Sequence, residues 1–267
     1  MIYFAPEAEA ELTAAGLEPG RMGYFASRAA PMGPVPAEVV TATFHNFSGT
    51  AVARVIPKAW DLAAPEKIIA ARFRAVDGAL RRMLGGEVLR SPQVAEAAGL
   101  ARRAATACSV PGRPLAAGHL ELDWPEEPHL ELWHALSVLR EHRGDGHVAA
   151  LVDAGLSGPE ALVTHTATGN GFLPEFARTR RGWTEAEWDA TVAELRGRGL
   201  LDDAGGLTER GRELRTGLED ATDRLAAGPW SALGEAGTER LGELGGPLVR
   251  ALLDAGCFPR HGVFAGS

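Results

Sequence analysis

The sequence predicts a mainly helical protein made of two diverged repeats, spanning 1–127 and 128–267. Of its 267 residues, 45% are hydrophobic and 23% are charged, which is the balance of an ordinary globular chain. Apolar residues recur at helical spacing through most of the C-terminal half. The same order of elements can be traced again in the N-terminal half, so repetition is weighed before any other feature.

The clearest local pattern predicts a helix that begins at Thr184 and ends near Gly199. Thr184 is a good N-cap, and Glu187 three residues later completes a capping box. One buried stripe is predicted for this helix, formed by Trp188, Val192 and Leu195. Glycine is a common residue just beyond the end of a helix.

A short β-hairpin and long helices are predicted after this point. Leu201 and Leu207 flank the polar, glycine-rich turn 202–206, which is typical of two short extended pieces. Regularly spaced leucines then predict two amphipathic helices, with buried faces at Leu207, Leu214, Leu218 and Leu225 and at Leu241, Leu244, Leu248 and Leu252. Upstream, 146–169 reads as two short helices separated by a turn at 155–158.

Residues from about 128 to 256 resemble a MarR-type winged-helix regulator. The resemblance is carried by LRGRGLLDDAGGLTERGREL at 195–214, which is similar to that family's helix, short hairpin or wing, and following helix. It implies a winged-helix fold, although the family's wing is longer and more basic. The whole chain is also similar to a little-characterised group of actinobacterial proteins that carry a helix-turn-helix label, and such a label describes fold rather than activity.

The N-terminal half predicts a degenerate copy of the same unit. Laying AAPMGPVPAEVVTATFHNFS beside DAGLSGPEALVTHTATGNG places Trp60 opposite Trp183, and a helix starts at Pro65. The wing has nearly vanished in this copy, and chance similarity between helical segments is the alternative reading. A true duplication predicts an intramolecular pseudo-dimer, working as a monomer or weak homodimer, with a cavity between the repeats.

Charge argues against nucleic acid as the main partner. The net charge is −8, so the field of the whole molecule repels phosphates. The predicted outward stripe of the second reading helix is Glu187, Thr191, Glu194 and Arg198. In the first copy, Lys67, Arg74 and Arg81 align on one helix face and are the candidate DNA contacts, with a solvated surface as the alternative. DNA is therefore a disfavoured partner.

A polar cluster near the junction of the repeats predicts a ligand site. It comprises His134, Arg140, Glu141, His142, Arg143, Asp145 and His147. His134, Glu141 and Asp145 would share one side of a helix that ran through Gly144, but Gly144 and Gly146 are expected to end the helix there. A carboxylate beside imidazoles could orient a ligand or move a proton. The alternative is a helix end whose basic side chains meet free carbonyl groups.

The first repeat adds Tyr24, Arg28 and His45 to the predicted ligand site. These polar groups are embedded among aromatic and small residues, as in the wall of a pocket. For His45, a hydrogen-bonded core position is the alternative. No role is predicted for His119, His129 and His261, which lie in sequence that reads as loops.

Several classes of function find no support in the sequence. Cys108 and Cys257 are too few for a disulfide framework or thiolate metal site, and no metal site is expected. No phosphate loop, dinucleotide fingerprint or nucleophile motif is present, so no cofactor is expected. The opening segment has neither the basic start nor the apolar run of a signal peptide, which predicts a cytoplasmic protein without membrane partners.

The leading hypothesis is a winged-helix protein that has largely lost DNA binding and holds a small organic ligand, which could be anionic, between its repeats. Its predicted ligand-binding residues are Tyr24, Arg28, His45, His142, Arg143, Asp145 and His147. One alternative is a ligand-responsive MarR-type transcription regulator. A further alternative is an enzyme that uses histidine and aspartate for acid–base chemistry in the same pocket.

Overall fold

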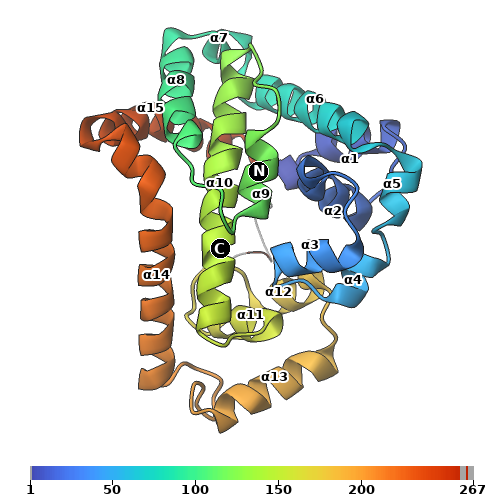
Figure 1. Cartoon of the computed structure of the whole chain (residues 1–267), viewed down its shortest axis with the longest axis vertical. Coiled ribbons are helices and arrows are strands. Elements are labelled where there is room, and N and C mark those ends of the chain that lie inside the picture. The colour runs from blue at the N-terminus through green and yellow to red at the C-terminus, as the bar shows by residue number, and fades with distance from the viewer. Residues whose placement is uncertain (1, 259–262, 264–267) are drawn as a thin grey trace. The chain divides into compact units, whose positions relative to one another are not determined.

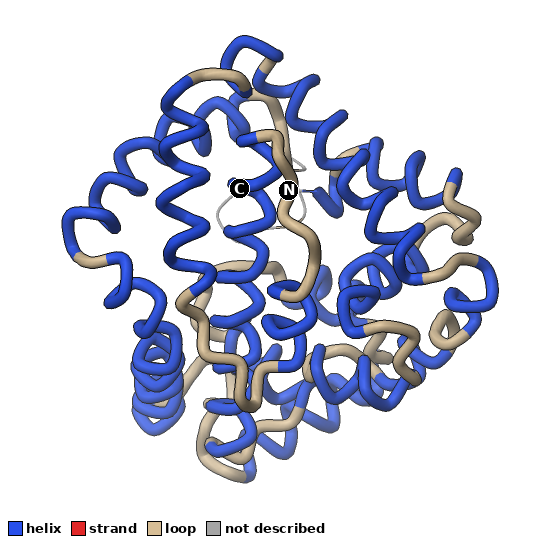
Figure 2. Tube along the Cα trace, turned by 45° about the horizontal axis from the view of Figure 1, so that its top comes forward, coloured by secondary structure: helices blue, strands red, loops and turns tan. Residues whose placement is uncertain are grey.

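The computed structural model of the chain describes residues 2–258 and 263, and these residues are mainly helical (Figures 1 and 2). Within them, extended pairing is limited to one antiparallel bridge between Leu201 and Leu207. The predicted helical class is confirmed. The predicted β-wing appears only as that bridge, because the glycine-rich turn is followed at once by a helix.

The chain divides into two compact units, each assembled from separate stretches. Unit 1 comprises Met1–Pro36, Val55–Asp145 and Ala226–Phe258. Unit 2 comprises Ala37–Arg54, Gly146–Leu225 and the C-terminal stretch in which Val263 is described. The divisions after 145 and after 225 fall inside two long helices, so each of these helices contributes residues to both units.

The elements of unit 1 are η1 (Ile2–Phe4), α1 (Pro6–Ala14), α2 (Arg21–Ala29), η2 (Ala30–Met32), α5 (Lys58–Leu62), α6 (Pro65–Leu84), α7 (Gly86–Leu89), α8 (Pro92–Thr106), α9 (Pro114–Leu120), the first part of α10 (Pro128–Asp153), the end of α14 (Glu209–Leu233) and α15 (Glu235–Asp254). Those of unit 2 are α3 (Ala37–Phe44), α4 (Gly49–Ala53), the end of α10, α11 (Gly158–Thr166), α12 (Pro174–Arg181), α13 (Glu185–Gly197) and most of α14.

Helix α6 organises one side of unit 1. It begins at Pro65, where the fixed backbone of proline suits the first helical turn, and ends before Gly85 with φ of 78°. Helix α1 packs along it, and α2 and η2 also contact it. Val76 and Leu80 are buried, while Ile69 and Phe73 are half-buried.

Helix α10 is longer than the sequence predicts. It runs from Pro128 to Asp153 and passes through Gly144 and Gly146, which were expected to end it. Each glycine costs a helix roughly 1 kcal/mol relative to alanine. Tertiary contacts made by the side chains of Glu141 and Asp145 on this turn offset that cost.

Helix α9 is seated against η2 by a close approach at Gly118. A Cβ atom at this position would lie 2.6 Å from the carbonyl oxygen of Pro31, so only glycine fits. The neighbouring His119 is thereby carried into the interior, where it is 1% exposed. The prediction that His119 lies in a loop without contacts is wrong, because proline at 114 and this packing allow a short helix.

Helix α13 follows the local signals closely. The Thr184 and Glu187 side chains form the predicted capping box, and Gly199 beyond its end has φ of 67°. Its apolar side packs on α11 and contributes to a core made by Val163, Leu195, Leu200, Leu201 and Leu207. This core is the apolar centre of unit 2.

The segment that follows α3 is wedged against α11 in unit 2. His45 has φ of 51°, and its ring Nε2 lies 3.0 Å from the carbonyl oxygen of Leu156. A Cβ atom on Gly158 would lie 2.3 Å from the His45 carbonyl oxygen, so this glycine is required for the approach. Ser157 and Glu160 form a capping box that starts α11 beside it.

Candidate functional site

A buried ion pair lies at the centre of the candidate site in unit 1. Arg28 of α2 donates from Nε to Glu141 Oε1 at 3.1 Å and from Nη2 to Oε2 at 2.8 Å. The side chain of Glu141 is 1% exposed. Burial raises its pKa, but attraction by Arg28 and by Arg140, which also contacts it, outweighs that effect and brings the pKa to about 2. Glu141 is therefore a buried carboxylate that stays ionised.

The next turn of α10 holds helix α9. The backbone N–H of Ala116 donates to Asp145 Oδ2 at 2.9 Å, and Arg113 donates to the carbonyl oxygen of His142. Burial raises the pKa of Asp145 to about 6, in spite of that hydrogen bond. Burial, together with repulsion from Arg113, lowers the pKa of His142 to about 4. At neutral pH, His142 is uncharged and Asp145 is close to its protonation point.

A second buried basic group, Arg72 of α6, has no carboxylate partner among the described residues. Its Nη1 lies 2.8 Å from His119 Nε2 and donates to the Ser27 carbonyl oxygen at 3.3 Å, while its Nε has no partner. His119 Nδ1 lies 2.9 Å from the Leu115 carbonyl oxygen, which places the imidazole hydrogen on Nδ1. Burial and the charge of Arg72 lower the pKa of His119 to about 3.

His134 is the most isolated polar group of this interior. It is completely buried, and neither ring nitrogen has a hydrogen-bond partner. The rings of Trp124 and Phe73 lie with their centroids 4.7 and 5.8 Å from the imidazole. Burial, with the positive charge of Arg72, lowers the pKa of His134 to about 4, so the ring is neutral near pH 7.

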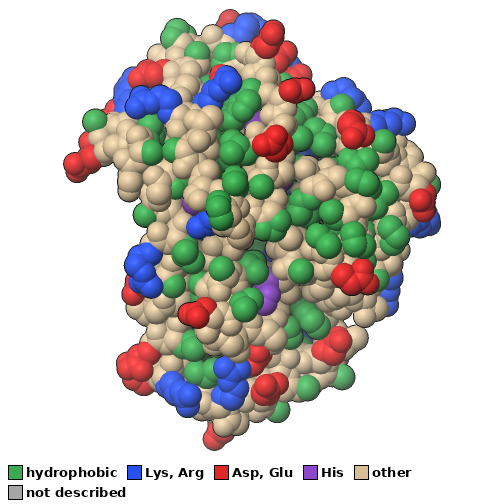
Figure 3. Space-filling model, viewed as in Figure 1, with side chains coloured by type: hydrophobic (Ala, Val, Ile, Leu, Met, Phe, Trp, Pro, Cys, Tyr) green, Lys and Arg blue, Asp and Glu red, His purple; other side chains and the backbone are tan. Residues whose placement is uncertain are grey.

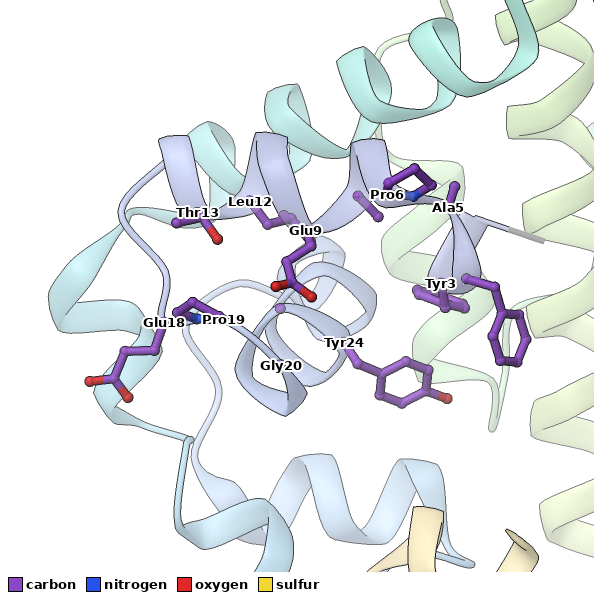
Figure 4. A pocket seen from close by; sticks show the side chains of 13 residues that line it. Tyr3, Ala5, Pro6, Glu9, Leu12, Thr13, Glu18, Pro19, Gly20 and Tyr24 are labelled. Atoms are coloured by element: carbon purple, nitrogen blue, oxygen red, sulfur yellow. The ribbon is translucent and has the colours of Figure 1, made fainter. Parts of the chain in front are cut away.

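A cavity of about 240 Å³ opens beside the ion pair (Figure 4). Its walls come from η1, α1, the following turn and the start of α2, and they include Tyr3, Phe4, Glu9, Thr13, Glu18 and Tyr24. The rings of Tyr3 and Tyr24 meet edge to face with centroids 4.7 Å apart. Arg28 Nη1 lies 3.5 Å from the Tyr24 hydroxyl oxygen, so Tyr24 links the cavity to the ion pair.

The structure brings together part of the predicted ligand set. Tyr24 and Arg28 are joined to Glu141, and His142 and Asp145 lie on the same helix as Glu141 and in the same unit. Arg143 is exposed on α10. The remaining predicted residues belong to unit 2.

In unit 2 the two remaining predicted ligand residues make separate contacts. His147 Nδ1 donates to Thr222 Oγ1 at 2.8 Å, because the Thr222 hydroxyl hydrogen is used on the Leu218 carbonyl oxygen. His45 contacts the backbone of Leu156, as the core alternative predicts.

Sequence reasoning missed Arg72, His119, Tyr3 and Glu9 as parts of the site, and it set Glu141 aside because Gly144 and Gly146 were expected to end the helix. Glu141 and Asp145 are one helical turn apart and share a face only if α10 continues through Gly144. That spacing was the available signal for Glu141. His129, also predicted to have no role, is buried on α10 with Nε2 2.7 Å from Asp77 Oδ1, and His261 lies outside the described residues.

The exposed side of α13 carries carboxylates and small residues. Glu185, Glu187, Asp189 and Glu194 are exposed, as are the three alanines at 186, 190 and 193. Thr191, predicted to face outward, is 7% exposed because its hydroxyl bonds the Glu187 carbonyl oxygen and the helix is rotated onto α11. In the space-filling view, acidic side chains lie among basic ones at the bottom of the face, where α13 is found (Figure 3).

The basic residues proposed for DNA contact in the first repeat lie on α6. Lys67 is exposed, whereas Arg74 pairs with Glu11 at 2.7 Å and Arg81 pairs with Asp77 at 2.8 Å. These carboxylates offset two of the three positive charges on that face.

The arginines before α13 are partly engaged with aromatic rings. Arg180 lies 5.3 Å from the centroid of Phe176, and Arg181 lies 4.6 Å from that of Phe47.

Comparison with known proteins identifies the fold family. Within the described residues, every helix is too short or too polar to cross a membrane. Neither the curated proteins nor the solved structures include one that matches this chain. The model of a helix-turn-helix family matches residues 1–259, which is almost the whole sequence. The chain therefore belongs to this helix-turn-helix family.

Proposed function

We propose that this helix-turn-helix protein binds a small organic molecule in unit 1, in the cavity walled by Tyr3 and Tyr24. The observation that carries the proposal is the buried ion pair behind Tyr24, in which Arg28 holds Glu141 at two oxygens. A buried ion pair contributes little net stability, and perturbed titratable groups concentrate at functional sites. Both members of the pair lie in unit 1.

The pair would position Tyr24 for a ligand. Because Glu141 uses both carboxylate oxygens on Arg28, the guanidinium is held in one orientation, and it keeps the Tyr24 hydroxyl within reach. A fixed aromatic ring with a polar tip is suited to recognise a small molecule. The phenol ring supplies apolar contact area and its hydroxyl can exchange hydrogen bonds with the ligand.

The second part of the proposal is that α13 does not read DNA. A recognition helix needs side chains that donate to phosphates and base edges, whereas the exposed side of α13 presents Glu185, Asp189 and Glu194. Arg198, at the end of the helix, is paired with Glu160. Phosphates would meet negative charge along most of this helix.

The test is ligand binding by the purified protein, measured by ligand-observed NMR with a library of small cationic, neutral and anionic compounds. We expect to find ligands whose binding is lost in Tyr24→Ala. The same ligands should still bind Phe176→Ala, which removes an aromatic side chain from unit 2. Tyr24→Phe should retain part of the affinity because it keeps the ring. Ligands that bind Tyr24→Ala as well as the unchanged protein would overturn the assignment of this cavity.

A DNA-binding regulator is the second candidate, and membership of the helix-turn-helix family favours it. It would use Arg178 and Arg180 of α12, which is followed directly by α13. The test is a titration with genomic DNA fragments at about 50 and 200 mM salt. DNA binding that weakens steeply with salt and is lost in the double variant Arg178→Ala/Arg180→Ala would support the regulator. The absence of binding at low salt would exclude it.

A further inference from the structure

The three glutamates of α1 have different surroundings. Glu7 binds Arg82 and Glu11 binds Arg74, so these two carboxylates hold α1 against α6. Glu9 lies between them in sequence but faces the other side, into the cavity (Figure 4). Among the described residues, the Glu9 carboxylate has no hydrogen-bond or ion-pair partner. This carboxylate is therefore available to a ligand.

The charge of the whole lining is negative. The other carboxylate of the cavity, Glu18, is exposed and already pairs with Lys58. Among the described residues, the cavity wall includes no arginine or lysine side chain. Arg28, which contacts Tyr24 of the wall, is paired with Glu141. Glu9 is also exposed, and within the part of the chain that the structure describes it is the carboxylate of the wall that has no paired cation.

Aromatic rings form the wall beside Glu9. Tyr3 and Tyr24 lie together at one end of the cavity (Figure 4), and Phe4 also lines its wall. The face of an aromatic ring carries partial negative charge and attracts ammonium groups within about 6 Å of its centroid. Carboxylate and aromatic rings thus favour the same sign of ligand charge, and neither alone would define the ligand class.

We propose that this cavity binds a small organic cation, a protonated or quaternary amine. The ammonium group would lie near Glu9, and its methyl or methylene groups would contact the rings of Tyr3 and Tyr24. This inference rests on the proposed function, because it specifies the ligand class of the same site. The cavity volume of about 240 Å³ suits a compact amine.

The test compares charged ligands with uncharged partners of the same shape. Choline is paired with 3,3-dimethylbutan-1-ol, and propylammonium with butane, each titrated into the full chain near pH 7.5 and low salt by NMR. We expect at least one cation to bind about tenfold more tightly than its uncharged partner. The resonances of Tyr24 and Tyr3 should shift during the titration.

Two variants on α1 distinguish a direct contact between Glu9 and the cation from a general effect of the negative charge of the protein. Glu9→Gln should lower the affinity for the cation about fivefold or more and leave the affinity for the uncharged partner unchanged. Glu11→Gln is the matched control, because it removes the same charge from the α6 side of α1. It should change the affinity for the cation by less than twofold.

The outcomes distinguish this inference from the function on which it rests. If neither cation binds more tightly than its partner, or if Glu11→Gln weakens binding as much as Glu9→Gln does, the cation inference is wrong. Neutral or anionic library ligands that are lost in Tyr24→Ala would then still support the cavity as a binding site. If no ligand of any charge depends on Tyr24, both proposals fail.

Discussion

The two units place their charged residues differently. In unit 1, Arg28, Arg72 and Glu141 are enclosed by helices, and the neighbouring His119 and Asp145 have pKa values shifted mainly by their own burial. In unit 2, the core below α13 is apolar, and the buried Glu160 and Arg215 pair with the more exposed Arg198 and Glu219. Unit 1 thus encloses both members of an ion pair, whereas each of these buried charges of unit 2 has a partner nearer the surface.

The difference indicates where selection for function is expected to act. An apolar core provides stability directly, since each buried leucine contributes about 1.5 to 3 kcal/mol. Buried charges offset their own desolvation at best, so a helical unit gains little stability from enclosing them. Their presence in unit 1 is therefore better explained by a binding site than by a gain in stability. Five measurements test this difference between the units.

The largest expected effect comes from removing one member of the buried ion pair. Glu141→Ala leaves Arg28 charged and without its carboxylate, which should lower the free energy of unfolding by about 3 to 5 kcal/mol. Urea unfolding followed by circular dichroism measures it. Glu194→Ala, on the exposed side of α13, is the control and should leave stability unchanged. A loss below about 1 kcal/mol for Glu141→Ala would contradict the enclosed pair.

Truncation of the unit 2 core should cost nearly as much. Leu195 lies on the buried side of α13 and is completely enclosed. Leu195→Ala should therefore lower the free energy of unfolding by about 3 kcal/mol through lost contacts and a residual cavity. The same urea experiment applies, with Leu225→Ala at a 40% exposed position as the comparison. Equal effects at the two leucines would show that α13 is not packed on this core.

The pH dependence of stability should reveal His134. Burial and Arg72 lower its pKa to about 4 in the folded protein, whereas the unfolded chain binds the proton near pH 6.5. Stability from this group is therefore lost as the pH falls from about 6.5 to 4, by about 3 kcal/mol. His134→Phe should remove that loss when unfolding is measured across the range. If the pH dependence of stability is the same in the variant, the pKa of His134 does not differ between the folded and the unfolded protein.

Asp145 should give the opposite slope. Burial raises its pKa to about 6, so the folded state takes up a proton before the unfolded state, whose aspartate titrates near pH 4. Stability from this group rises as the pH falls from about 6 to 4, by about 2 kcal/mol. Asp145→Asn should remove this gain while keeping an acceptor for the Ala116 N–H. A larger gain in the variant would contradict the raised pKa.

The smallest effect is expected at the start of α13. Thr184→Ala removes the side chain that caps the helix by accepting from the Glu187 N–H, and it should cost about 1 kcal/mol. Hydrogen exchange of the first turn should accelerate in the variant. Thr184→Ser, which keeps the hydroxyl, should restore most of the protection. No acceleration would show that packing on α11, rather than the cap, holds this turn.

Much of the candidate site could not be predicted from local sequence. Tyr24 and Arg28 were recognised as polar groups in apolar surroundings, and His142 and Asp145 as part of a polar cluster. The group that joins them, Glu141, looked like one more charge near a helix end. Its partner Arg28 is 113 positions away, and no short pattern records such a contact. His119 was dismissed because a short helix after proline resembles a loop.

The sequence by itself determined the helical class, the start and end of α13, and the turn before α11. These features depend on apolar spacing, capping side chains and glycine at the helix end, which act within a few residues. Only the tertiary structure decided that α10 continues through Gly144, that Glu141 meets Arg28, and that Glu9 alone of the α1 glutamates faces the cavity unpaired. Those outcomes depend on which distant helices pack together, because long-range contacts outweigh local preferences of about 1 kcal/mol.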